Sequence, residues 1–177
     1  MLNFLNFSLK FTIVFIIVTL MFALSTLWYF SIGLPDYKKL SNYQPPISSR
    51  VYSKDGKLIA EYAIEKRLFV PFESIPVKVI NSFLSAEDKN FFEHPGVDAK
   101  GILRAIIKNI KNLSQKKRLE GASTITQQVA KNFLLTNEVS VKRKIKEAIL
   151  AFRIERAYTK ERILELYLNQ IYLGQGT

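Results

Sequence analysis

The sequence contains no cysteine and a single histidine, His94, among its 177 residues. The absence of cysteine excludes disulfide bonds and thiolate metal sites. One histidine excludes a zinc site built from several imidazoles and argues against a Ser-His-Asp hydrolase. Any chemistry must therefore rest mainly on carboxylates, hydroxyls, amides and cationic side chains.

Charge is nearly absent from the first 35 residues, where Lys10 is the sole charged side chain. Residues 11–34 are almost wholly apolar, and a helix of that length, at about 1.5 Å per residue, spans the roughly 30 Å core of a bilayer. Small residues around Ala23 and Ser25 leave a cleaved signal peptide as the alternative. Because the apolar run continues through Trp28, we expect an uncleaved signal anchor, whose orientation the flanking charges leave open.

The remaining chain is strongly basic. The net charge is +11, and 25 of the 26 Lys and Arg residues follow the apolar run. Such a surface favours polyanions: nucleic acid, anionic lipid head groups or a pyrophosphate-bearing substrate. The basic residues are not interleaved with stacking aromatics in a recognisable module, so nucleic acid is not an expected partner.

The length allows one compact domain behind the anchor. We divide the chain into a tail (1–10), a transmembrane signal anchor (11–34), a proline-containing linker (35–48), a small β element (49–72) and a mainly α domain (73–177). Asp55-Gly56 between two β-prone segments predicts a hairpin, and residues 68–72 predict a third short strand.

Helical periodicity begins at Ser74 and predicts that Glu87 and Asp88 lie near the end of a helix. Residues able to cap a helix stand before each later segment of helical periodicity: Asp98, Ser123 or Thr124, Ser140 and Thr159. Residues 112–121 are basic, polar and end in glycine, which predicts a loop.

A carboxylate pair and the histidine lie together in residues 87–98. By spacing alone, Glu87 is a solvated carboxylate at a helix end, and Asp88 either orients a base or caps a turn. His94 precedes Pro95-Gly96, so it is expected to brace a loop, and Asp98 to fix the turn before the next helix.

Hydroxyls and amides follow Gly121 in residues 122–128. At a helix start they suit phosphate or sugar hydroxyls, although a well-capped amphipathic helix explains the same pattern. Arg143 and Glu147, four residues apart, would by default form an exposed pair worth about 0.3–0.5 kcal/mol.

Four segments, taken in order, resemble the motifs of the peptidoglycan glycosyltransferase domain (glycosyltransferase family 51) of class A penicillin-binding proteins: residues 87–98, 121–128, 143–147 and 160–169. The resemblance covers residues 50–174, and residues 36–72 resemble the approach to this domain in 1A-type proteins. It implies a lysozyme-like helical fold. The implied reaction is inverting polymerisation of lipid II into glycan strands, with loss of undecaprenyl pyrophosphate.

The resemblance also implies residue roles. Glu87 is the base, partly withdrawn from water by apolar neighbours. Glu147 is the second catalytic acid, holding a divalent cation (Mg²⁺ or Mn²⁺) or the basic residues that receive the pyrophosphate; no organic cofactor is implied. Substrate and pyrophosphate binding falls to Ser123, Thr124, Gln127, Gln128, Lys131, Arg143 and Lys144, with Asp88, His94 and Asp98 in support.

Further expectations follow from the family. Lipid II, the growing strand, the membrane and other cell-wall synthesis proteins are the expected partners, with the domain on the periplasmic face of the bacterial inner membrane. Ala122 replaces a more frequent glycine. Family members continue past Thr177 through more of this domain and a transpeptidase domain, so the chain is expected to be an N-terminal part of such a protein, or a truncated product.

Two alternatives remain open. The chain could be a catalytically inactive, membrane-anchored protein that binds lipid-linked precursor or a cell-wall partner. It could also be a lysozyme-like enzyme that cleaves peptidoglycan, since a glutamate in a helical domain serves that reaction too. The anchor and the basic pyrophosphate-type residues favour the polymerase.

Overall fold

The computed structural model describes residues 2–41, 43, 49–62, 69–136 and 138–171. The described chain is mainly helical, as the periodicity predicts, with one small sheet. Its elements in order are α1 (Leu2–Ser31), the 3-10 turn η1 (Tyr37–Leu40), β1 (Ser49–Tyr52), β2 (Leu58–Tyr62), the 3-10 turn η2 (Phe72–Ser74), α2 (Val77–Glu87), α3 (Ala99–Ser114), α4 (Ile125–Leu134), α5 (Val141–Ala157) and α6 (Lys160–Gln170).

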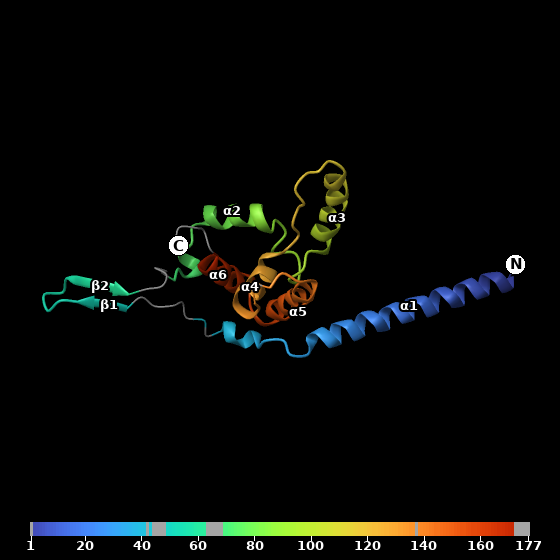
Figure 1. The fold of residues 1–177 in the computed structure, drawn as a ribbon, viewed down its shortest axis with the longest axis horizontal. Helices are drawn as coiled ribbons and strands as arrows, with labels where there is room; N and C mark the ends of the chain where they lie inside the picture. Colours follow the sequence, from blue (N-terminus) through green and yellow to red (C-terminus); the bar gives the residue numbers. More distant parts are fainter. Residues whose placement is uncertain (1, 42, 44–48, 63–68, 137, 172–177) are drawn as a thin grey trace.

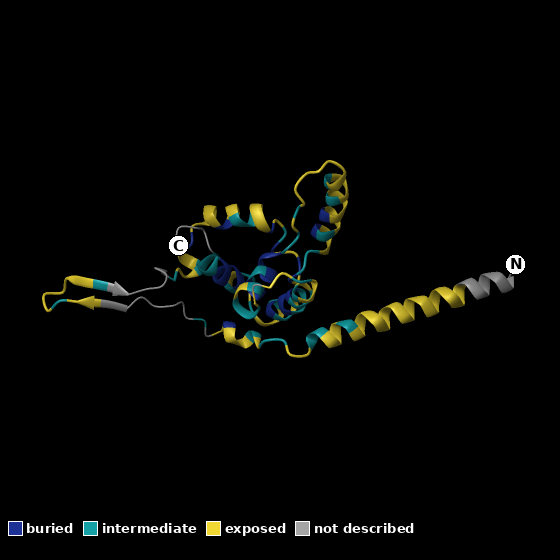
Figure 2. Cartoon of the chain, in the orientation of Figure 1, coloured by how far each residue is buried: buried dark blue, intermediate teal, exposed yellow. Residues whose placement is uncertain are grey.

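Helix α1 projects away from the helical domain, and most of its described side chains are exposed (Figures 1 and 2). Its segment Leu9–Ser31 is long and apolar enough to cross a membrane. The C-terminal end of α1 contacts α5, where Arg153 donates a hydrogen bond to the Ser31 hydroxyl at 2.6 Å. The anchor is therefore joined to the domain at this end.

The segment after α1, predicted as a linker, also contacts the domain. Asp36 caps η1, and Leu40 at its end is 1% exposed and belongs to the core. Tyr158 of α5's end donates a hydrogen bond to the Tyr37 carbonyl at 3.0 Å. This stretch therefore fixes the base of α1 against the helices.

The predicted hairpin is confirmed: β1 and β2 pair antiparallel, and Gly56 in the turn between them has φ +75°. The predicted third strand is wrong over residues 69–72, while Leu68 lies outside the described residues. Val70 exchanges both of its backbone hydrogen bonds with the Asn169 side-chain amide, at 2.8 and 2.9 Å. Because Pro71 has no N–H either, no ladder can form there.

The core surrounds α4, which packs against both α5 and α6 (Figure 1). Its first turns are almost wholly buried. The fully buried side chains come from several elements, among them Phe91, Ile125, Val129, Leu150, Ile154, Ile163, Leu164, Leu166 and Tyr167. Burial of this size is the main source of stability for the domain.

The predicted N-caps are confirmed. Asp98, Thr124, Ser140 and Thr159 each accept a hydrogen bond from a backbone N–H of the helix that follows. The predicted loop at 112–121 begins later, because α3 continues to Ser114. Asn109 holds that loop by two bonds to the Glu120 backbone, at 2.9 and 2.7 Å.

Candidate active site

Asp88 connects the end of α2 to the start of α4. Its buried carboxylate accepts a hydrogen bond from the Ile125 backbone N–H at 3.0 Å and lies 2.9 Å from His94 Nε2. His94 Nδ1 accepts from the Gly96 N–H at 3.2 Å, so the proton belongs on Nε2, which donates to Asp88. The structure thus places His94 as a loop brace, the role expected of it.

Gly96 allows this turn to press against α5. Its φ is +94°, and a Cβ there would lie 2.8 Å from the Ala151 backbone carbonyl. Thr124 donates its hydroxyl proton to the Gly96 carbonyl at 2.6 Å. The turn that carries His94 is therefore fixed to both α4 and α5.

Glu87 ends α2 with its side chain exposed. Gln128 Nε2 on α4 donates a hydrogen bond to Glu87 Oε2 at 2.9 Å. The exposure of Glu87 means that the apolar neighbours expected to withdraw it from water, among them Phe83 and Phe91, leave it open to solvent. Glu87 is instead a solvent-facing carboxylate oriented by an amide.

Glu147 lies between two cations. Its side chain is 3% exposed, with Oε1 at 2.9 Å from Arg143 Nε and Oε2 at 2.8 Å from Lys144 Nζ. Lys144 Nζ also donates to the Ser123 hydroxyl. The default expectation of an exposed Arg143–Glu147 pair is wrong, because this turn of α5 packs against the core. We call these four residues, Ser123, Arg143, Lys144 and Glu147, the cationic cluster.

The cationic cluster carries two positive charges against one negative charge. The guanidinium of Arg143 has five N–H donors in a planar fork, and the Lys144 ammonium has three. Glu147 therefore fixes both cations in place and leaves the cluster with a net charge of +1. Such an arrangement suits a multiply charged oxyanion.

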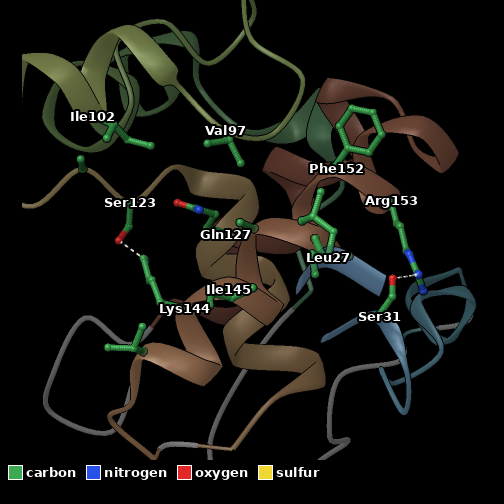
Figure 3. Close-up of a pocket in the computed structure, with 14 residues that line it drawn as sticks. Leu27, Ser31, Val97, Ile102, Ser123, Gln127, Lys144, Ile145, Phe152 and Arg153 are labelled. Atoms are coloured by element: carbon green, nitrogen blue, oxygen red, sulfur yellow. Dashed lines mark hydrogen bonds between the residues drawn. The ribbon is translucent and has the colours of Figure 1, made fainter. Parts of the chain in front are cut away.

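A groove of about 800 Å³ begins at Ser123 and Lys144. Its walls are mainly apolar and come from α5, the turn before α3, α3 itself and the end of α1: Leu27, Val97, Ile102, Ile145, Ile149 and Phe152. Figure 3 shows Ser123, Gln127 and Lys144 at one end and Leu27, Phe152 and Arg153 at the other. The groove thus has apolar walls and a polar group at each end, with Ser123 and Lys144 at one end and the hydrogen-bonded Arg153 and Ser31 at the other.

Two residues predicted to bind a ligand cap a helix in the structure. Thr124 and Gln127 form a reciprocal capping box at the start of α4, and their residues are 2% and 3% exposed. Because their polar atoms bond each other and Gly96, they shape the helix start more than they reach a ligand. Gln127 still borders the groove.

Two other predicted residues lie apart from the cluster. Lys131 is half-buried on α4, and its ammonium forms no hydrogen bond or ion pair with the described residues. Asp98 caps α3, where the backbone N–H of Gly101 holds the pKa of its carboxyl below the ordinary value. Asp98 is therefore part of the scaffold, and Lys131 is a cation available to a ligand.

The residues do not fit a divalent cation at Glu147. Among the described residues no group of three or more metal-ligating side chains is found. The two Glu147 oxygens already face Arg143 and Lys144, and such cations replace a metal rather than bind one. No step below involves a metal.

Sequence reasoning missed Lys160 as a site-supporting residue. Its ammonium donates to the His94 carbonyl and to Glu155, both at 2.7 Å, and lies 4.4 Å from the Phe91 ring centroid. Thr126 donates to the same Glu155 oxygen at 2.6 Å. The signal that could have found it was a lysine at a helix start, where cations are disfavoured unless paired.

Tyr167 was predicted only as a packing residue, but its hydroxyl is unusual. Its hydroxyl is buried with no hydrogen-bond partner among the described residues. Its ring packs edge to face against the Phe83 ring, with 6.1 Å between the ring centroids. Phe83 lies one helical turn before Glu87 on α2. Burial, and then the negative charge of Glu87, raise the pKa of this phenol.

Tyr167→Phe is therefore expected to keep or raise the free energy of unfolding, by up to about 1–2 kcal/mol, because it removes an unsatisfied buried hydroxyl. Tyr158→Phe is the matched control and should lose about 1 kcal/mol with its bond to Tyr37. Thermal unfolding of both variants in detergent checks this. A Tyr167→Phe loss as large as the control's would mean that the hydroxyl has a partner.

Comparison with known proteins gives the family. A family model described as Transglycosylase matches residues 55–177. The chain belongs to the transglycosylase family. It is 58% identical over 170 residues to penicillin-binding protein 1A of Rickettsia felis, covering 96% of this chain and 22% of that protein.

More distant organisms carry similar proteins. Identity to penicillin-binding protein 1A is 50% over 144 residues in Aquifex aeolicus, covering 81% of this chain and 19% of that protein. Identity to penicillin-binding protein 1A of Pseudomonas aeruginosa is 50% over 146 residues, covering 82% of this chain and 17% of that protein. The chain thus spans about a fifth of the length of these relatives, and the resemblance found in the sequence is confirmed.

Proposed function

We propose that the chain is a peptidoglycan glycosyltransferase that joins lipid II units into glycan strands with inversion. The observation that carries this is the convergence of three motifs on the start of α4. Glu87 contacts Gln128, Asp88 contacts Ile125, and Lys144 contacts Ser123. A solvent-facing base and a cationic oxyanion site thereby flank one helix start.

In this reaction Glu87 takes the proton from the 4-hydroxyl of the acceptor sugar. The hydroxyl oxygen forms a bond to the anomeric carbon of the donor, from the face opposite the pyrophosphate. The bond from that carbon to the pyrophosphate oxygen breaks, and the leaving group departs with the electron pair. Arg143 and Lys144 stabilise the charge that develops on it, and Lys131 supplies a further cation.

The groove suits the lipid part of the leaving group. It runs from the cationic cluster along Ile145 and Ile149 to Leu27 of α1. An amphiphile with an anionic head and a long apolar chain matches its polar end and apolar walls. The apolar chain would then leave beside the anchor.

The exposure of Glu87 favours transfer over cleavage. A glycosidase needs a carboxylic acid that keeps its proton, which an apolar pocket provides. Glu87 is exposed and accepts a hydrogen bond from Gln128, which suits a base. Incubation with purified peptidoglycan tests the alternative: we expect no release of sugar fragments, and their release would favour a lysozyme-like enzyme.

We also propose that α1 crosses the bacterial cytoplasmic membrane once, with the domain on its outer face. Helix α3 supports the placement. Its exposed apolar residues share one face, at 52–73% exposure: Leu103, Ile106, Ile107, Ile110 and Leu113. Next to them lies an exposed basic face: Lys100, Arg104, Lys108 and Lys111.

In Figure 1, α3 runs across the direction of α1, on the side where α1 leaves the domain. Only its narrow third face, with Gly101 and Ala105, is buried. A helix with adjacent apolar and basic faces lies in the plane of an anionic membrane interface. The position of α3 thus agrees with a bilayer penetrated by α1.

Because the chain has no cysteine, a single introduced cysteine is a unique labelling site. In proteoliposomes, a polarity-sensitive probe on Ile107→Cys is expected to report an apolar environment and to be quenched by shallow spin-labelled lipid. The same probe on Asp55→Cys, in the distant hairpin turn, should report water. A water-exposed probe at Ile107 would contradict this membrane placement.

A further inference from the structure

A second cavity, of about 200 Å³, lies where the end of α1 meets the first turns of α5. It is lined by Tyr29, Phe30, Ile32, Lys142 and Lys146. None of these residues lines the substrate groove. The proposed reaction therefore does not use this cavity.

The two lysines give the cavity unbalanced positive charge. Lys142 and Lys146 lie one turn apart on α5, and neither forms an ion pair or hydrogen bond with the described residues. Arg143 and Lys144, by contrast, share Glu147. The first turn of α5 contains no acidic residue, so the positive end of the helix dipole adds to the same field.

The other walls are those of a membrane interface. Tyr29 is 63% exposed and meets Phe30 edge to face at 5.3 Å. The segment of α1 able to cross a membrane ends at Ser31, so these aromatic rings lie at its boundary, where tyrosine is preferred. Under the membrane placement proposed above, the cavity opens at the depth of the lipid head groups.

We propose that this cavity binds the phosphate of an anionic phospholipid head group in the outer leaflet. The ammonium groups of Lys142 and Lys146 contact the phosphate oxygens, and Phe30 and Ile32 contact the glycerol and upper acyl chain. Clustered lysines near a membrane surface attract anionic lipid head groups. The bound lipid would hold the end of α1 against α5. Leu27 of α1 and Ile149 of α5 line the neighbouring groove.

The test uses the whole chain in phosphatidylcholine nanodiscs that contain a minor fraction of spin-labelled phosphatidylglycerol. The measured quantity is the association constant of the motionally restricted phosphatidylglycerol relative to phosphatidylcholine. Lys142→Gln/Lys146→Gln is expected to lower it about thirtyfold, since two basic contacts near an anionic surface are lost. Lys38→Gln/Lys39→Gln removes equal charge from η1 and should change it much less, because neither side chain lines the cavity.

Equal selectivity in the parent and the Lys142→Gln/Lys146→Gln variant would overturn the proposal. A second arm titrates inorganic phosphate into the same nanodiscs. Displacement of phosphatidylglycerol by millimolar phosphate would show a site for free phosphate and overturn the lipid assignment; no displacement supports it. Neither readout requires catalysis, so failure of the transferase proposal and failure of this one are distinguishable.

Discussion

Glu87→Gln is expected to reduce the initial rate of lipid II polymerisation by about two to four orders of magnitude, the usual contribution of a general base. The substitution keeps the size of the side chain and an oxygen that can accept the bond from Gln128. What it removes is the capacity to take the proton of the attacking hydroxyl. The rate is measured with labelled lipid II in detergent.

Two controls test whether the loss of polymerisation rate in Glu87→Gln is specific. Glu93→Gln changes another exposed carboxylate, six residues after Glu87, and should leave the rate unchanged. Because Glu87 is exposed, the Glu87→Gln variant should unfold at the parent's temperature. A folded Glu87→Gln variant that polymerises at the parent's rate would remove Glu87 from the mechanism.

Glu147→Gln is expected to lower the free energy of unfolding by about 3 kcal/mol, the lower end for a broken buried ion pair. The lower end applies because Arg143 and Lys144 are 19% and 46% exposed and can turn toward water. Freed from Glu147, Lys144 also loses its fixed place beside Ser123. Polymerisation should therefore fall as well, even at temperatures where the variant stays folded.

A double-mutant cycle isolates the pair. Arg143→Gln should cost the parent more stability than it costs the Glu147→Gln variant, with a coupling of about 1–3 kcal/mol. Glu138→Gln, an exposed carboxylate before α5, should have little effect. Additive effects of Arg143→Gln and Glu147→Gln would show that the two side chains do not interact.

The features that the sequence predicted well are local ones. A helix start depends on one hydroxyl or carboxylate and the next three N–H groups, so Asp98, Thr124, Ser140 and Thr159 could be recognised from their neighbours. The hairpin could be recognised from Asp55-Gly56 between two β-prone segments, since Gly56 tolerates the positive φ that the turn needs. The family resemblance likewise rested on short contiguous motifs.

The features that it missed depend on distant partners. The third strand is absent because Asn169, 99 residues away, takes the Val70 backbone bonds. Leu40 joins the core only because the helices pack over η1. No local pattern in residues 35–48 contained that information.

Within the site, residue types were predicted more reliably than environments. The motif identified Glu147 as a site residue, but only the packing of α5 shows that it is buried between Arg143 and Lys144. Thr124 and Gln127 were predicted to bind a ligand, with a helix cap as a compatible explanation, and their mutual hydrogen bonds show the cap. Glu87 was expected near apolar rings, yet Phe91 next to its turn enters the core.

The most direct test of the account is polymerisation of labelled lipid II by the detergent-solubilised chain, with circular dichroism showing that it is folded. We expect glycan strands that lengthen with time, with one undecaprenyl pyrophosphate released for each bond formed. A folded chain that binds lipid II but forms no strands would contradict it, and this chain would then be a binding protein rather than a transferase.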